Sequence, residues 1–231
     1  DTLHKTVILA MLAYGFAPDL RTLSVTGLRS GIEAADIRYA RKLGFRVKLL
    51  GILRGRDGEV ELRVAPTLVP VDSMLGSVNG VFNAALVQSD LAGTTLYYGR
   101  GAGRLPTAST VLGDIADVAF NRVHKAPLRV ILPRPSHPMR LKPAGEVISR
   151  HYVRVSIRDE AGTMAKVASI LAAKGVSIAS VLQQDLAETE GGLVPVVILT
   201  HKARQAAVEA AIAEIDALDI IGAPSVRMGI E

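Results

Sequence analysis

Along the last third of the chain, apolar positions switch repeatedly between a strand-like and a helical period. A helical stretch over 162–174 spaces four apolar residues three or four positions apart: Met164, Val167, Ala168 and Leu171. A second helical stretch covers 201–218. Strand-like segments precede, separate and follow the two helices, at 151–157, 176–185, 193–200 and 223–230, with a turn at Gly191-Gly192. The order strand-helix-strand-strand-helix-strand predicts a ferredoxin-like fold.

The first half of the chain mixes helices and hairpins. Residues 3–14 are apolar on nearly every side, which predicts an interior helix ended by Gly15 and Pro18. Residues 31–44 predict an amphipathic helix with one apolar side, formed by Ile32, Ile37, Ala40 and Leu43.

Two strand pairs and a further helix complete this half. Strands over 46–53 and 60–69 flank a turn that we expect to contain Gly55, Asp57 and Gly58. Strands over 81–88 and 94–98 flank a turn with Asp90 and Gly93. Pro106 then opens a helix that reaches about Asn121, because proline is tolerated in a first helical turn.

Prolines mark the connection between the two halves. Five of them interrupt residues 125–150: Pro127, Pro133, Pro135, Pro138 and Pro143. A long helix is excluded there. We therefore predict an α+β protein with a mixed sheet and helices in domain 1–124, a linker over 125–150 and a ferredoxin-like domain over 151–231.

Composition narrows the classes of function. Hydrophobic residues make up 49% of the 231 residues and cysteine is absent, which excludes disulfides and thiolate chemistry and fits a cytoplasmic protein. The net charge of +5 comes from scattered lysines and arginines, so a nucleic-acid partner is not expected. No stretch predicts a membrane span. The chain starts at Asp1 directly in a helical pattern, so we expect further residues upstream.

Asp1 and Lys5 form the first candidate for chemistry. Four positions apart on a helix, they can form an ion pair, which by itself indicates only a small structural contribution. Their place at the mouth of an apolar helix suggests a second interpretation. A lysine desolvated there and tethered to a carboxylate can serve in proton transfer.

The second candidate is a glycine-rich loop between a strand and a helix. It runs Gly99-Arg100-Gly101-Ala102-Gly103-Arg104, just before the helix that Pro106 opens. Glycines permit close backbone approach to a ligand, and a helix start favours anions. The spacing matches neither the dinucleotide fingerprint nor a phosphate-binding loop, so a plain tight turn explains it equally well.

Taken together, these segments resemble homoserine dehydrogenases. The resemblance runs in family order over residues 1–121 and rests on these positions: Asp1-Thr2-Leu3-His4-Lys5, Gly31-Ile32, Asp36, Ala40, Leu43-Gly44, Lys48-Leu49-Leu50, Asn83-Ala84, Gly101-Ala102-Gly103 and Pro106-Thr107-Ala108. Residues 151–231 resemble the ACT regulatory domain that such enzymes often append.

The resemblance implies a specific reaction and specific roles. Such enzymes interconvert L-homoserine and L-aspartate 4-semialdehyde with NAD or NADP. Lys5 matches the proton-transferring lysine, and Asp1 the aspartate that holds substrate and orients it. Gly103 and Gly101 match the segment that lies against the cofactor. The nucleotide-binding domain is not in this chain, so we expect the chain alone to be inactive.

The ACT-like region implies control by an amino acid. Asp159-Glu160-Ala161-Gly162-Thr163 resembles the effector loop of ACT domains, with Ala161 at the usual proline position. Asp159, Gly162 and Thr163 are thus candidate effector contacts, threonine is the effector that the pathway suggests, and a homodimer or higher homo-oligomer is expected. No metal site is expected. The alternative is an amino-acid-binding regulatory or dimerisation module without catalysis.

Overall fold

The computed structural model describes residues 1–29, 31–126, 138–183 and 193–231. It contains two compact units, Asp1–Val69 with Pro133–Glu231, and Pro70–Leu132. These units group residues by contact, and the functional division into a substrate domain, a linker and an ACT domain stays a prediction. Three linker prolines (Pro127, Pro133 and Pro135) and the Gly191-Gly192 turn lie outside the described residues.

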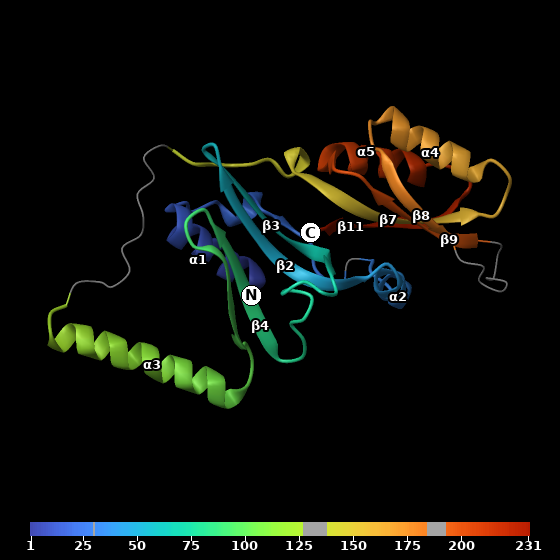
Figure 1. The fold of residues 1–231 in the computed structure, drawn as a ribbon. Coiled ribbons are helices and arrows are strands. Elements are labelled where there is room, and N and C mark those ends of the chain that lie inside the picture. The colour runs from blue at the N-terminus through green and yellow to red at the C-terminus, as the bar shows by residue number, and fades with distance from the viewer. Residues whose placement is uncertain (30, 127–137, 184–192) are drawn as a thin grey trace. The chain divides into compact units, whose positions relative to one another are not determined.

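The larger unit is built on one mixed sheet (Figure 1). Its main path runs β1-β3-β11-β7-β9-β8, with β2, β6 and β10 paired at the sides. The strands are β1 (Ser24–Val25), β2 (Phe45–Arg56), β3 (Glu59–Pro70), β6 (Arg140–Leu141), β7 (Ile148–Arg158), β8 (Ile178–Gln183), β9 (Leu193–Thr200), β10 (Ala203–Arg204) and β11 (Ile221–Ile230). The helical elements are α1 (Thr2–Tyr14), η1 (Leu20–Thr22), α2 (Ala34–Lys42), η2 (Ala144–Glu146), α4 (Thr163–Ala173) and α5 (Gln205–Asp216).

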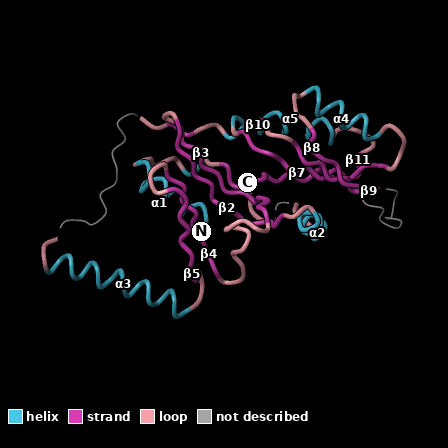
Figure 2. The backbone as a smooth tube through the Cα atoms, in the orientation of Figure 1, coloured by secondary structure: helices cyan, strands magenta, loops and turns pink. Residues whose placement is uncertain are grey.

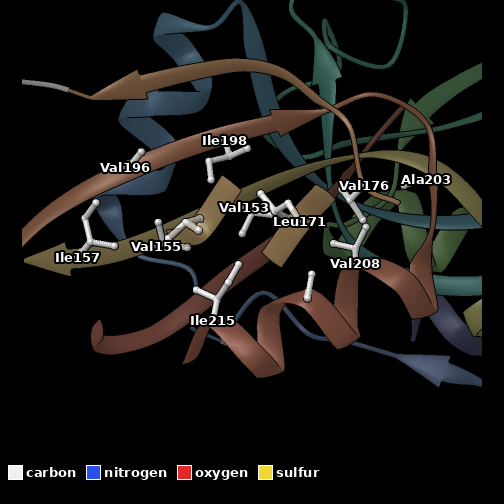
Figure 3. Packing of buried hydrophobic residues seen from close by; sticks show 12 residues of the cluster. Val153, Val155, Ile157, Leu171, Val176, Val196, Ile198, Ala203, Val208 and Ile215 are labelled. Carbon is white, nitrogen blue, oxygen red and sulfur yellow. The ribbon is translucent and has the colours of Figure 1, made fainter. Parts of the chain in front are cut away.

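The carboxyl-terminal part confirms the predicted ferredoxin-like order. Strands β11, β7, β9 and β8 are neighbours in that order, all antiparallel, and α4 and α5 cover one face. Figure 3 shows the core between them. Its members are fully or nearly fully buried aliphatic side chains, among them Val153, Val155, Leu171, Val196, Ile198, Val208 and Ile215. Leu171 and Val167 come from the periodic stretch that predicted the helix.

The opposite face of the same sheet packs against α2. Tyr39 and Ala40 of α2 share a buried cluster with Tyr152, Leu199 and Met228. Residues of β7 alternate between the two faces, so Tyr152 points toward α2 while Val153 points toward α4 and α5. Helix α2 is therefore attached directly to the ACT-like part.

A parallel strand pair joins the two regions of this unit. In β11, Gly229 and Ile230 pair with Thr67 and Leu68 of β3. The Glu231 carboxylate then bonds Arg63, with Oε1 2.8 Å from the guanidinium, and also contacts Arg54. The chain's last strand thus extends the sheet of the first region.

Helix α1 lies on the hairpin of β2 and β3. Its C-cap Gly15 is left-handed, as its place after an apolar run predicts. The expectation of an interior helix was wrong for this chain: only Thr6 and Ala10 are buried, and Ile8, Leu9 and Leu12 are about half exposed. One face of α1 packs on the sheet. Because the helix is apolar on most sides, its periodicity could not predict which side would be buried.

The predicted turn between β2 and β3 is shorter than expected. It consists of Asp57 and Gly58, both with positive φ, at 51° and 78°. Gly55 lies inside β2 instead, where its N–H donates to the Tyr14 hydroxyl at 3.0 Å. A glycine inside a strand marks a close approach, here of a helix.

The second unit contains a hairpin and one long helix (Figure 2). Strands β4 (Phe82–Ser89) and β5 (Gly93–Arg100) pair antiparallel over their whole length. Helix α3 (Arg104–Val123) follows, and each of its residues is exposed or half-buried. The exposed residues include large apolar side chains: Leu105, Leu112, Ile115, Val118 and Val123.

A buried histidine predicts acid sensitivity of the larger unit. Burial, reinforced by the charges of Arg227 and Arg63, lowers the pKa of His151 to about 4. The unfolded chain binds the proton near pH 6.5, so the stabilisation is complete above that pH and is lost as the pH falls toward 4. We expect this group to cost about 3 kcal/mol of unfolding free energy between pH 7 and pH 4.

Urea unfolding at several pH values measures this effect. The His151→Gln variant should lose stability less steeply than the parent chain below pH 6.5. Replacing the exposed His201 by glutamine is the matched control and should leave the slope unchanged. Identical slopes for the parent and His151→Gln would contradict the assignment.

Candidate functional site

Asp1 and Lys5 form an ion pair at the start of α1. Asp1 occupies the N-cap position, and its Oδ2 lies 2.7 Å from Lys5 Nζ. The two side chains are 79% and 56% exposed, respectively. The tether is present, but the expected desolvation is not, because half of the lysine side chain meets solvent in this chain. Because both side chains are exposed, a ligand can reach the ion pair from solvent.

The position of this ion pair is set by close packing beneath α1. Thr6 donates its hydroxyl to Thr2 O at 2.8 Å and lies directly against Gly51 of β2. At the other end of the helix, the Tyr14 ring covers Gly55. Gly51 and Gly55 are four apart on one strand and so share a face.

Gly51 is a functional candidate that the sequence pattern did not identify. Part of the signal was available, since Gly51 lies inside the predicted strand 46–53 and a glycine there indicates a close backbone approach, whereas Gly55 was expected in the turn. What approaches them could not be read from the strand itself.

Gly101 and Gly103 lie in the short loop between β5 and α3. A side chain on Gly101 would collide with Asn83, whose Nδ2 would lie 1.8 Å from the new Cβ. Gly103 has φ 121° and ψ 141°, a conformation open in practice only to glycine, and it forms the N-cap of α3. Local geometry therefore requires glycine at both positions, whether or not a ligand binds.

Aromatic and cationic side chains flank this loop. Phe82 and Tyr98 stack with their ring centroids 4.8 Å apart, and the Arg100 guanidinium lies 5.7 Å from the centre of the Phe82 ring. The loop backbone is exposed at Gly101, Ala102 and Gly103. It fits a role in lining a flat ligand such as a nicotinamide ring, but it does not make a complete nucleotide site. This loop and the Asp1–Lys5 pair belong to different units.

The predicted effector residues lie at the start of α4. Gly162 is the left-handed N-cap, with φ 88°, and Asp159 is exposed before it. Thr163 is only 4% exposed, and its N–H donates to Glu160 O at 3.2 Å. Of the three predicted effector residues, Asp159 and Gly162 are exposed to a ligand, whereas the Thr163 side chain is not.

A buried polar cluster, not foreseen from the sequence, links α2 to β7. The Asp36 carboxylate is fully buried and accepts from the Tyr152 hydroxyl at 2.8 Å. It also accepts two bonds from Arg154, at 2.7 and 3.1 Å. Burial and the Asp36 charge raise the pKa of Tyr152 well above its ordinary value, so the hydroxyl stays a donor. Asp36 belongs to the family resemblance, but its partners lie more than a hundred residues away.

In the part of the chain that the structure describes, neither a metal-binding cluster nor a membrane-spanning helix is found. No three His, Asp or Glu side chains there are grouped so that they could hold a metal ion. Likewise, none of the helices described is both long and apolar enough to cross a bilayer.

Comparison with known proteins agrees with this architecture. A homoserine dehydrogenase family model matches residues 1–116, and an ACT domain model matches residues 151–217. The homoserine dehydrogenases of Neisseria gonorrhoeae and Pseudomonas aeruginosa are each 38% identical over 235 aligned residues that cover the whole of this chain. The chain spans about half their length, 53% and 54% respectively.

A solved structure shows the same fold. The crystal structure of a homoserine dehydrogenase from Thiobacillus denitrificans is 36% identical, superposes with a TM-score of 0.85 and covers 99% of this chain. This chain corresponds to 52% of that structure. With the family model spanning half of its residues and an ACT domain following, the chain belongs to the homoserine dehydrogenase family.

Proposed function

We propose that this chain is the substrate and regulatory portion of a homoserine dehydrogenase, which interconverts L-homoserine and L-aspartate 4-semialdehyde. The observation that carries the proposal is the solvent-facing Asp1–Lys5 pair, fixed on the first turn of α1 in a chain of this family. The homoserine dehydrogenases that match the whole of this chain are about twice as long, so the chain corresponds to about half of such an enzyme.

The two residues have complementary roles in the proposal. Oxidising the substrate alcohol removes a hydride from carbon and a proton from oxygen. Lys5 in its neutral form accepts that hydroxyl proton, and in the reverse direction its ammonium returns a proton to the aldehyde oxygen. Asp1 holds the lysine in place and contacts the polar end of the substrate. A nicotinamide cofactor, NAD or NADP, supplies the hydride acceptor when bound.

The loop at Gly101 and Gly103 is proposed to lie against that cofactor. Its exposed backbone and the N-terminus of α3 suit the approach of a planar, partly charged group. The sequence holds no dinucleotide fingerprint, so most of the binding energy must come from elsewhere. The exposed apolar side chains of α3 support contact with a further protein surface, because such side chains are normally covered.

The test compares this chain with the full polypeptide that contains it. We expect the full polypeptide to oxidise L-homoserine with NAD or NADP, and the 231-residue chain to show no turnover. Absence of turnover by the full polypeptide with either nucleotide would refute the proposed activity. Turnover by the 231-residue chain alone would refute the proposed division of labour.

The ACT part is proposed to bind an amino-acid effector, threonine, at Asp159 and Gly162. An effector carboxylate would meet the N-terminus of α4, and its ammonium would meet the Asp159 carboxylate. Within the described residues β8 pairs only with β9, so its other edge is open for side-by-side pairing of two copies in a homodimer or larger homo-oligomer.

Calorimetry tests the effector site. Threonine should release or absorb heat on binding, and Asp159→Asn should weaken binding about tenfold or more through the lost ammonium contact. Isoleucine, methionine and lysine are the comparison ligands, and Asp219→Asn is a matched surface control. If none of the four amino acids binds, the ACT part serves dimerisation only.

The alternative, a regulatory or dimerisation module without catalysis, is favoured by one observation. Strands β3 and β11 pair, so that the first region and the ACT part share a single sheet. A shared sheet is what we expect if the two parts form one binding module. Threonine binding without any dehydrogenase turnover by the full polypeptide would select this alternative.

A further inference from the structure

Gly51 is the point where α1 comes closest to the sheet. A Cβ built on Gly51 would lie 2.0 Å from Thr6 Oγ1 and 3.2 Å from Thr6 Cβ. It would also touch Thr2 Cγ2 at 3.4 Å. The first distance is far below any contact that real side chains make, so a methyl group at position 51 must rotate the Thr6 side chain, and the 3.2 Å distance to Thr6 Cβ requires the helix start itself to shift as well.

The helix rests on two separate points. Thr2 and Thr6, on the first turns, contact Gly51, and Tyr14, on the last turn, contacts Gly55. The Tyr14 hydroxyl also accepts from the Gly55 N–H at 3.0 Å. The two ends of α1 are therefore positioned by different residues of the same strand, and a change at one end need not move the other.

Lys5 and Asp1 move together with the first turn. Both belong to that turn and are joined by their own ion pair. Beneath them Thr2 and Thr6 meet Gly51, while Leu3 and Val7 pack against the buried cluster that contains Val60 and Leu62 of β3. Because the pair is exposed, no surrounding wall holds the ammonium in place. Among these supports, the contact between Thr6 and Gly51 is the one with no side chain between helix and strand, so the height of the ammonium above the sheet depends on it directly.

We propose that Gly51 is a positioning residue for the reaction. Because Gly51 has no side chain, the first turn of α1 can approach the sheet closely, and this approach places Lys5 and Asp1 where proton transfer requires them. This inference rests on the proposed dehydrogenase function. A displacement of about 1 Å of a reacting group can lower a rate about a hundredfold. Gly51 would then act on catalysis without touching substrate.

The experiment uses the full polypeptide and four variants: Gly51→Ala, Thr6→Ala, the double variant Thr6→Ala/Gly51→Ala, and Gly55→Ala. We expect Gly51→Ala to lower kcat about tenfold or more and to raise the solvent deuterium isotope effect, because misplaced proton transfer limits the rate. Thr6→Ala, which opens a gap at the same point, should lower kcat severalfold. In the double variant the new methyl group at position 51 fills the space that Thr6 Oγ1 leaves, so kcat should recover.

Gly55→Ala is the matched structural control. Its Cβ would lie 2.5 Å from the Tyr14 ring, so it should destabilise the same helix through its other end. We expect a lowered melting temperature but a kcat within about twofold of the parent, with an unchanged isotope effect. A loss of kcat in Gly55→Ala equal to that in Gly51→Ala would overturn the proposal, since general loosening of α1 would then suffice.

Each remaining outcome decides between the two proposals. If the parent polypeptide has no turnover, the proposed function fails, and melting temperatures of the Thr6 and Gly51 variants still show whether the two positions are coupled. If the parent turns over and Gly51→Ala retains its kcat, only the positioning role falls. If Gly51→Ala does not fold, Thr6→Ala decides: an unchanged kcat and isotope effect would overturn the positioning role.

Discussion

Replacing Asp36 by alanine should destabilise the larger unit by about 3–5 kcal/mol, the cost of leaving a buried charge without its partner. Arg154 is 6% exposed, and its guanidinium would lose both bonds to the carboxylate. Tyr152 would lose the acceptor of its hydroxyl. The remaining contact, from Arg154 to the exposed Glu33 at 3.4 Å, is too long and too solvated to compensate.

Two variants make this expectation specific to burial. Asp19 makes a similar two-oxygen pair with Arg21, but in solvent, so Asp19→Ala should cost far less stability than Asp36→Ala. Removing both buried charges, in Asp36→Leu/Arg154→Met, should restore most of the stability lost by Asp36→Ala. Urea unfolding measures all three, and equal losses for Asp36→Ala and Asp19→Ala would show that burial does not govern this pair.

Replacing Lys5 by methionine in the full polypeptide should lower kcat for homoserine oxidation about 10²–10⁴-fold, the usual contribution of a positioned proton-transfer group. The folded state should be nearly unaffected, because the exposed ion pair with Asp1 contributes no more than about 1 kcal/mol. Loss of rate without loss of melting temperature is therefore the expected signature.

Lys174 provides the matched control for this experiment. It forms an ion pair with Glu214 at 2.7 Å on the ACT part, and it is also partly exposed. Lys174→Met removes the same kind of contact and should leave kcat unchanged. Should Lys5→Met retain more than about a tenth of the parent rate, Lys5 is not the proton-transferring group.

Secondary structure was predictable wherever it depends on neighbours in the sequence. The spacing of Val167 and Leu171 predicted α4, and both prove fully buried on one side of that helix. Pro106 predicted the helix after Gly103, which begins two residues earlier than expected, at Arg104, and has Pro106 in its first turn. Such patterns are local, since residues three or four apart meet on any helix.

Burial was predictable only where one face was clearly apolar. Helix α1 is apolar on most sides, so its pattern could not show that Thr6 and Ala10 would be the buried face. Ile37 was expected on the apolar side of α2 but is about half exposed, while Asp36 beside it is fully buried. The buried bonds to Arg154 and Tyr152 reverse the usual preference of a carboxylate for solvent.

By itself, the sequence determined the order of the longer helices and strands, the ferredoxin-like part and the spacing of Asp1 and Lys5 on one helical turn, because each depends on residues only a few positions apart. Tertiary structure alone decided that β11 pairs with β3, that Asp36 meets Arg154, and that Thr6 rests on Gly51. These contacts join residues 45 or more positions apart, and they depend on strand order and register, which no local period encodes.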